Sequence, residues 1–330
     1  MNRIILFLLG AVLLSSACEK DLLRPDIEAR PQAVFHYLWN DLHQRYAFFE
    51  EKDIDWQEVK QRYASEIKPN MSNKALFDLL SDMLFELQDG HVNLSSGFDR
   101  SRNWTWFEGY PDNFDANVVK RYYLGSDYRI TGALENTIID SVLYVRYASF
   151  ASTVTLGQLN FIIDRAKNTK GIIIDVRHNG GGSIGNAYRF AGAFTEKPYV
   201  FGKQRFKTGK TSFSEWEELS VEPISENPFQ GKVVVLSNRR SYSAANFFLQ
   251  MMKERPNTIL MGDHSGGGGG IPAFGELPNG WVYRFSASQL IDLESRQLEF
   301  GVKVHQRAST TPEDATKGID AIIEKALKEF

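Results

Sequence analysis

The stretch VVVLSNRRSYSAANFFLQMM, from Val233 to Met252, contains a strand, a turn and an amphipathic helix. Its first residues form an apolar run, which is typical of a strand buried on both faces. Ser241 and Ser243 occupy the turn that follows. A serine at this place can cap the helix. It can also be a nucleophile that the turn aims at a substrate near a helix N-terminus. Both interpretations stay open on this stretch alone.

Similar strands and helices alternate on both sides of this stretch. An alternation of this kind predicts an α/β core with parallel strands. The expected elements are a strand at 141–150, a helix at 156–167, a strand at 171–177, a helix at 184–194 and a strand at 257–262, with a final helix near the C-terminus. Residues 98–140 are rich in Tyr, Trp, Asn and Asp and have only weak strand signals.

The N-terminal third of the chain has a helical periodicity instead. Val34, Leu38 and Leu42 share one helix face, and Ser72 can cap a third helix further on. We therefore expect a small helical subdomain over residues 32–97 and an α/β core over residues 98–330.

The first residues resemble a bacterial lipoprotein signal. A charged start precedes an apolar run, Ile4–Leu14, and the sequence SSAC ends at Cys18, the only cysteine. The run is too short to span a bilayer. Leu14 lies four residues before Cys18, whereas the usual lipobox places Leu three before. We expect a signal peptide over residues 1–18, lipidation at Cys18, a tether over residues 19–31 and location in the cell envelope; an ordinary secretory signal is the alternative.

Composition excludes several other classes of protein. The chain has 330 residues and a formal net charge of −3, so no basic surplus indicates nucleic-acid binding. A sole cysteine excludes a disulfide framework. The chain contains no HExxH sequence and no Cys/His zinc spacing. We therefore expect no metal, no cofactor and no contact with a membrane other than the lipid anchor.

A glycine turn, HNGGGS over residues 178–183, follows the predicted strand at 171–177. Glycine lets a backbone turn sharply and approach a ligand closely. Backbone N–H groups near a helix N-terminus can bind an anion or an oxyanion. No GK[ST] follows, so a P-loop is excluded. A flexible turn without a ligand is the alternative.

Four motifs occur in one order: YVRYASF, GIIIDVRHNGGGS, VVVLSNRRSYSAANFF and ILMGDHSGGGGG. Together they resemble the tail-specific (C-terminal processing) and tricorn-core serine peptidase family, over roughly residues 141–304. The resemblance implies a crotonase/ClpP-like α/β fold behind the helical subdomain. It also implies that Ser243 is the nucleophile. Gly181 or Gly182, with Ala244, would form the oxyanion hole.

The general base differs between branches of this family. One branch uses a lysine at a place that corresponds here to Gly266–Gly270, which contains none. The tricorn branch uses a histidine after a helix, and ELQDGHVNL supplies His91 in that context. Imidazole is a competent base near neutral pH. The tricorn pattern has Ser before this histidine, whereas this chain has Gly90.

The family also implies a carboxylate close to a Gly-Val segment. Glu299 lies two residues before Gly301, where the family often has it three before; Glu276 is the reserve candidate. The implied role is to orient a polar group or to stabilise the charge on His91.

We expect the glycine run after His264 to be a mobile loop that accepts an extended peptide backbone, because glycine-rich segments are flexible. The expected substrate-binding residues are His178, His264, Gly266, Gly267 and Gly268. Residues 97–140 leave too little room for the PDZ domain that many family members carry.

The sequence therefore predicts a serine endopeptidase that acts on extended peptide or protein substrates. Two alternatives remain open. One is a degenerate peptidase that only binds a peptide or glycan. The other is an esterase on the same scaffold, since both reactions need the same nucleophile and oxyanion hole.

Overall fold

A seven-stranded sheet forms the centre of the computed structural model, which describes residues 29–330. The expected signal peptide, Cys18 and most of the tether lie outside these residues. Five strands are parallel and the last two are antiparallel. In spatial order the strands are β13 (Gln306–Arg307), β9 (Thr258–Gly262), β8 (Val233–Ser237), β5 (Ile172–Asp175), β4 (Val142–Tyr147), β3 (Leu134–Ile139) and β2 (Arg129–Thr131).

Both faces of this sheet are buried, which explains the apolar runs in the sequence. Successive side chains of a strand point to opposite faces. In β5, Ile172 and Ile174 join one hydrophobic core, whereas Ile173 joins a second core on the other face. Parallel sheets covered on both faces need apolar residues at every position. The predicted α/β core with parallel strands is confirmed.

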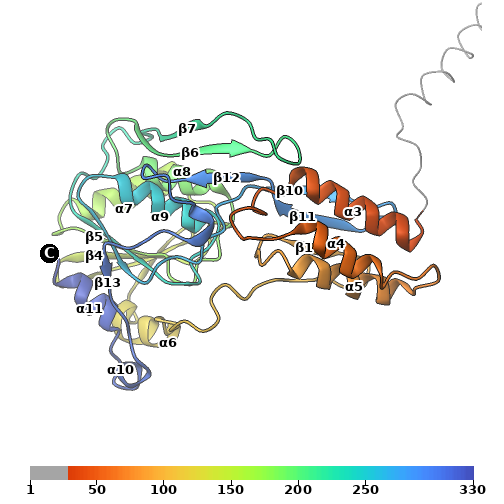
Figure 1. The fold of residues 1–330 in the computed structure, drawn as a ribbon. Helices are drawn as coiled ribbons and strands as arrows, with labels where there is room; N and C mark the ends of the chain where they lie inside the picture. Colours follow the sequence, from red (N-terminus) through yellow and green to blue (C-terminus); the bar gives the residue numbers. More distant parts are fainter. Residues whose placement is uncertain (1–28) are drawn as a thin grey trace, which may run out of the picture.

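Helices cover the two faces of the sheet (Figure 1). One face packs against α7 (Leu156–Ala166), α8 (Ile184–Gly192) and α9 (Ala244–Glu254). The other face packs against the π-helix η1 (Val119–Leu124) and α11 (Ala321–Leu327). Two shorter helices are α6 (Ala116–Val118) and α10 (Pro312–Thr316).

The N-terminal helices form a second body beside the sheet, at the right of Figure 1. They are α3 (Pro31–Arg45), α4 (Trp56–Ala64) and α5 (Asn73–Phe85). The Ser72 hydroxyl accepts a hydrogen bond from the Ala75 N–H and caps α5, as the sequence predicts. These helices share their hydrophobic core with Tyr283 and Phe285, which return from the C-terminal part of the chain.

That return forms a small sheet that the sequence did not indicate. Its strands, in spatial order, are β1 (Asn93–Ser95), β11 (Val282–Ser286) and β10 (Pro272–Glu276). The helical segment 32–97 therefore folds together with a hairpin from residues 272–286. The hairpin links the helices to the sheet-bearing core and holds the two bodies in contact.

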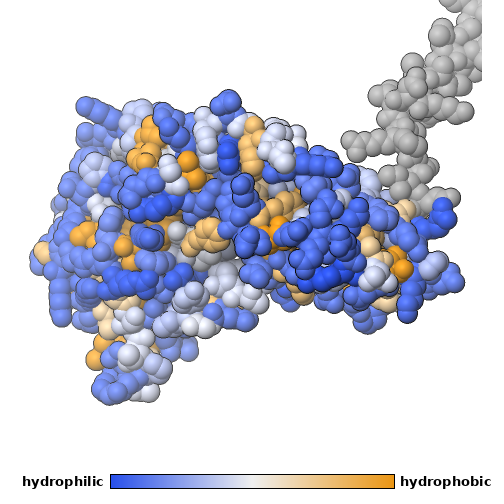
Figure 2. Space-filling model, in the orientation of Figure 1, coloured by the Kyte–Doolittle hydropathy of each residue, from blue (hydrophilic) through white to orange (hydrophobic). Residues whose placement is uncertain are grey.

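A third sheet borders the helices α8 and α9 (Figure 1). It consists of β12 (Ser288–Ile291), β6 (Tyr199–Phe206) and β7 (Glu217–Val221). The visible face of the molecule is largely hydrophilic, with hydrophobic residues in small separate patches (Figure 2). Within residues 29–330, no helix combines the length and the hydropathy that a membrane span requires.

Candidate active site

Ser243 stands at the turn between β8 and α9 in a strained backbone conformation. Its φ is 56° and its ψ is −120°, values that a residue with a Cβ rarely adopts. Such strain persists only where the surroundings impose it, and it is common at functional sites. The Ser243 side chain makes no capping hydrogen bond to α9. The helix-cap interpretation of this serine is therefore wrong.

The hydroxyl of Ser243 instead meets His91. His91 Nε2 lies 2.9 Å from Ser243 Oγ. The other ring nitrogen, Nδ1, lies 3.4 Å from the Ser286 Oγ at the end of β11. A proton on Nδ1 would face Ser286 and leave Nε2 free to accept the serine proton. The structure therefore brings the predicted nucleophile and the predicted base into hydrogen-bond contact.

Burial keeps the imidazole uncharged. The His91 side chain is almost fully enclosed, and burial is the largest influence on its charge. Burial lowers the His91 pKa to about 4; Asp89 opposes this shift, while Arg284 and Lys52 add to it. At neutral pH the imidazole is therefore neutral, which is the form that can accept a proton.

Two glycine-containing segments hold the backbone around Ser243. The Ser243 N–H donates to the Gly267 carbonyl at 2.9 Å, and the Tyr242 N–H donates to the Asn179 carbonyl at 3.0 Å. Ser241 has a separate, structural role, because its buried hydroxyl donates to the Val176 carbonyl at 2.8 Å. The two serines of the turn thus differ: one stabilises it and the other faces His91.

Two of the residues predicted to form the oxyanion hole, Gly181 and Ala244, lie beside Ser243. A Cβ placed on Gly181 would lie 2.8 Å from Ser243 Cβ and 2.9 Å from the Ala244 nitrogen, so only glycine fits there. Ala244 is the first residue of α9, and its N–H has no partner within the helix. The Gly181 N–H donates to Asn179 Oδ1 at 3.0 Å. Gly182, which bridges to Phe150, is the next residue of the turn.

A buried ion network lies at the end of β5, just before this glycine turn. Arg177 is fully buried, and its guanidinium binds both Asp175 and the Asp320 carboxylate, with Nη2–Oδ2 and Nη1–Oδ2 distances of 2.6 and 2.8 Å. Asp320 caps α11. Buried charges are stable only when they are paired and hydrogen-bonded. The Asp-Val-Arg part of the motif therefore has a structural role in this chain.

Trp106 and Tyr242 fill the space where a side chain at position 90, just before His91, would lie. The Trp106 ring stacks on Tyr242 at a centroid distance of 4.0 Å. A Cβ on Gly90 would lie 2.5 Å from the Trp106 ring and 2.8 Å from the Tyr242 hydroxyl. A serine at this position, as in the tricorn pattern, has no space here. Among the aromatic residues of the segment 98–140, Trp106 thus packs against the site.

Glu299 lies at the site but does not contact His91. Its Oε1 accepts a hydrogen bond from Lys52 Nζ at 2.8 Å, and its Oε2 accepts one from the Gly269 N–H at 3.0 Å. Burial and the neighbouring Asp89 raise the Glu299 pKa to about 7, although Lys52 opposes the shift. The reserve candidate, Glu276, lies exposed on β10. The role of Glu299 as catalytic carboxylate stays a prediction.

Asp89 is the acidic residue nearest to His91 along the chain, and it is not among the site residues predicted from the sequence. Its Oδ1 accepts the His91 N–H at 2.8 Å. Burial acts against its charge, but Lys52 and His91 keep the Asp89 pKa below its usual value. Its position two residues before His91 was the only signal available in the sequence.

The glycine run is not the mobile loop that the sequence indicated. Gly267–Gly270 are buried, and a Cβ on Gly267 would lie 1.9 Å from the Glu299 carbonyl oxygen. A Cβ on Gly268 would meet the Tyr242 ring at 2.5 Å, and one on Gly266 would meet the Arg239 carbonyl at 2.1 Å. Glycine is needed here because the backbones of three segments approach closely.

The two other selected histidines make contacts elsewhere. His178 Nε2 lies 2.8 Å from Asp112 Oδ1, and its ring packs on Phe114. His264 Nδ1 accepts the Val304 N–H at 3.2 Å. Neither of these hydrogen bonds involves Ser243 or a residue that contacts its hydroxyl. Substrate binding by these histidines and by Gly266–Gly268 stays a prediction.

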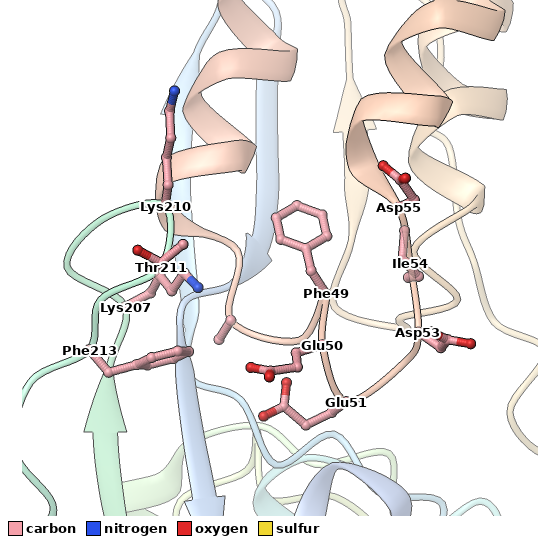
Figure 3. Close-up of a pocket in the computed structure, with 11 residues that line it drawn as sticks. Phe49, Glu50, Glu51, Asp53, Ile54, Asp55, Lys207, Lys210, Thr211 and Phe213 are labelled. Atoms are coloured by element: carbon pink, nitrogen blue, oxygen red, sulfur yellow. The ribbon is translucent and has the colours of Figure 1, made fainter.

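A cavity of about 580 Å³ lies next to the loop between α3 and α4. Figure 3 shows the carboxylates of Glu50 and Glu51 pointing towards Phe213, which follows β6. Lys207 and Lys210 also line the cavity. Neither His91 nor Ser243 contributes to its wall, so the cavity is separate from the dyad.

Comparisons with known proteins agree with this arrangement. Residues 141–307 match the model of peptidase family S41, and residues 27–85 match the tricorn protease C1 domain. A crystal structure of a candidate peptidase from Parabacteroides merdae is 40% identical, with a TM-score of 0.86, over 91% of this chain and 96% of that one. None of the curated proteins matches the chain.

Two more distant structures share the fold. Mature CPAF in complex with lactacystin is 13% identical, with a TM-score of 0.70, over 91% of this chain and 97% of that one. The photosystem II D1 C-terminal processing protease is 13% identical, with a TM-score of 0.55, over 84% and 93%. The match of one family model to half of the chain, together with a relative at 40% identity, shows that the chain belongs to peptidase family S41.

Proposed function

We propose that this chain is a serine endopeptidase in which Ser243 is the nucleophile and His91 is the general base. The observation that carries the proposal is the 2.9 Å contact between Ser243 Oγ and His91 Nε2, at a turn with φ of 56°. A nucleophile within hydrogen-bond reach of a base is the geometry that serine catalysis requires.

The reaction follows from these positions. Ser243 Oγ attacks the carbonyl carbon of the scissile peptide bond while its proton passes to His91 Nε2. The Ala244 N–H, with an N–H of the Gly181–Gly182 turn, stabilises the oxyanion. The carbon–nitrogen bond breaks as His91 returns the proton to the leaving amine. A water molecule then attacks the acyl-serine while its proton passes to His91. His91 returns this proton to Ser243 Oγ as the bond between Oγ and the acyl carbon breaks, and the second product leaves.

Extended polypeptides are the proposed substrates. The membership in a peptidase family supports a peptide bond as the target. The turn at Ser243 begins α9, and the nucleophile lies between the buried backbone of Gly267 on one side and His91 on the other. The strained serine and its neutral base favour an active enzyme over the degenerate binding protein.

A fluorophosphonate probe tests the nucleophile and the base. We expect labelling of the purified chain at Ser243, no labelling of Ser243→Ala and strongly reduced labelling of His91→Ala. Ser65→Ala and His36→Ala, both exposed on the helical body, serve as matched controls that should label as the wild type does. Folded wild-type protein that resists the probe would contradict the proposal.

Comparison of matched ester and amide substrates separates peptidase from esterase. A peptidase hydrolyses the amide substrate as well as the matched ester, because its base also protonates the amine leaving group. Turnover of esters alone, with Ser243 labelled normally, would favour the esterase.

We further propose that the mature protein is held in the cell envelope by lipid on Cys18. The support is the signal-like sequence that ends at the only cysteine of the chain. Metabolic labelling with radioactive palmitate should mark the wild type and leave Cys18→Ser unmarked. Equal labelling of both proteins would exclude this anchor.

A further inference from the structure

Lys52 lies in the loop between α3 and α4, and its side chain points into the protein. Its side chain is 9% exposed. Its Nζ atom lies 3.3 Å from the Leu87 carbonyl, 3.0 Å from the Gln88 carbonyl and 2.8 Å from Glu299 Oε1. An ammonium group has three protons to donate. All three are therefore committed to acceptors that belong to two different parts of the site.

The first two acceptors belong to the segment that leads to His91. Gln88 has a φ of 44°, in the left-handed region that side chains disfavour. A backbone conformation of this kind persists when neighbouring groups hold it. Lys52 bonds the carbonyls on both sides of this strained position, and the buried Tyr46 hydroxyl also donates to Leu87 at 3.3 Å. Lys52 thus fixes the backbone three residues before the base.

The third acceptor belongs to the segment that holds Ser243. Glu299 accepts the Gly269 N–H with its side chain and the Gly268 N–H with its carbonyl. The adjoining Gly267 carbonyl accepts the Ser243 N–H at 2.9 Å. The contact chain therefore runs from Lys52 through Glu299 and the glycine run to the nucleophile.

We propose that Lys52 is a positioning residue that sets the approach of His91 to Ser243, because it binds the segment before the base and the carboxylate that anchors the nucleophile's glycine run. This inference rests on the proposed function of the dyad and deepens it. Lys52 makes no direct contact with His91 or Ser243 and acts through Leu87, Gln88 and Glu299. Near the dyad, Lys52 connects the helical body to the sheet-bearing core through these hydrogen bonds.

Charge compensation is the competing explanation for a buried lysine. Lys52 lies near two carboxylates, since Glu299 and Asp89 both raise its pKa against the effect of burial. If compensation were its whole role, neutralisation of both carboxylates together with removal of the Lys52 charge would restore the site. If Lys52 positions the His91 segment, this triple variant still lacks the donor to the Leu87 and Gln88 carbonyls and stays impaired.

The test measures fluorophosphonate inactivation of the purified full chain, separated into the reversible binding constant and the first-order rate of Ser243 labelling. A misplacement of about 1 Å costs roughly 100-fold in rate, so we expect about this loss of the labelling rate in Lys52→Met, with the binding constant unchanged. Lys74→Met is the matched control, because this lysine is exposed on α5 and its ammonium group pairs with the exposed Asp78. Its labelling rate should equal that of the wild type.

The triple variant Lys52→Met/Asp89→Asn/Glu299→Gln should label as slowly as Lys52→Met; the amide oxygen at position 89 can still accept the His91 N–H. Restoration of the wild-type rate would overturn the positioning role, and so would a wild-type rate in Lys52→Met itself. If circular dichroism shows Lys52→Met to be unfolded, Lys52→Gln carries the same test, since an amide cannot donate to all three acceptors. Wild-type protein without labelling would instead overturn the proposed function.

Discussion

His91 Nε2 and Ser243 Oγ lie 2.9 Å apart although 152 positions separate the two residues along the chain. His91 follows the helical body, and Ser243 begins a helix of the sheet-bearing core. The contact therefore depends on how the two bodies pack. The hairpin of β10 and β11 ensures this packing, because β11 pairs with β1, just after His91, and supplies Ser286 beside the imidazole.

Substitution of the base should reduce catalysis and leave the fold intact. His91→Ala removes the group that accepts the Ser243 proton, and general-base catalysis contributes about 10²- to 10⁴-fold. We expect a loss of kcat in this range for a peptide substrate found by library screening, with a circular dichroism spectrum like that of the wild type. A kcat within threefold of the wild type would show that another group is the base.

The pH dependence of Ser243 labelling should reflect the buried state of His91. The base functions when it is neutral, and its pKa is lowered to about 4 chiefly by burial. The labelling rate should therefore stay near its maximum from pH 7 to pH 5 and fall only as the pH approaches 4. A midpoint near 6.5, the usual value for histidine, would contradict this prediction.

Stability has a different pH dependence from labelling. Between pH 6.5 and 4 the unfolded chain protonates His91 while the folded chain does not, so this residue lowers the free energy of unfolding as the pH falls. Glu299 acts in the opposite sense, because its raised pKa lets the folded chain hold a proton below about pH 7. The pH dependence of Ser243 labelling therefore reports the His91 pKa more directly than the pH dependence of stability does.

The sequence was sufficient to predict the strands β4, β5, β8 and β9 of the central sheet and the helices between them, but not its strands β2, β3 and β13. A strand such as β5 is buried on both faces and must be apolar throughout, so it is visible as an uninterrupted run. Strand β1 has three residues and carries no such run. The small sheet that joins the helical body to residues 272–286 was missed for this reason, since it depends on pairing between distant segments.

Polar residues of the site were harder to predict. Lys52 and Glu299 are 247 positions apart, and Lys52 stands in the charged stretch EEKD, which looks like a solvated loop. The glycine run gave a wrong interpretation for a related reason. Glycine occurs both where a chain is flexible and where backbones approach closely, and the sequence alone does not distinguish these cases.

Gly90 should tolerate no side chain. A Cβ would lie within 2.8 Å of both Trp106 and Tyr242, and overpacking of this kind costs about 1–3 kcal/mol. Gly90→Ala should lower the free energy of unfolding by this amount in urea titrations and slow the labelling of Ser243. Gly97→Ala is the control, because a Cβ there meets nothing within 4 Å. Equal stability of the two variants would contradict the packing of Trp106.

The glycine run should behave as a rigid element. Gly267 and Gly280 both have positive φ, 91° and 80°, so alanine strains the backbone similarly at both sites. Only at Gly267 would the new Cβ meet other atoms, 1.9 Å from the Glu299 carbonyl. Gly267→Ala should therefore reduce Ser243 labelling far more than Gly280→Ala. A mobile run would give two variants with similar rates, and amides of residues 266–270 that exchange hydrogen rapidly.

Arg177 should be required for folding rather than for the chemical step. Arg177→Met leaves the buried carboxylates of Asp175 and Asp320 without their partner, and breaking a buried ion pair in this way costs about 3–5 kcal/mol. We expect the free energy of unfolding, measured by urea titration, to fall by this amount, so the urea midpoint should also fall. The rate of Ser243 labelling per folded molecule should be normal. Arg307→Met, which removes an exposed arginine paired with Asp263, should change the midpoint little. Slow labelling of fully folded Arg177→Met would contradict this prediction and show that Arg177 also shapes the site.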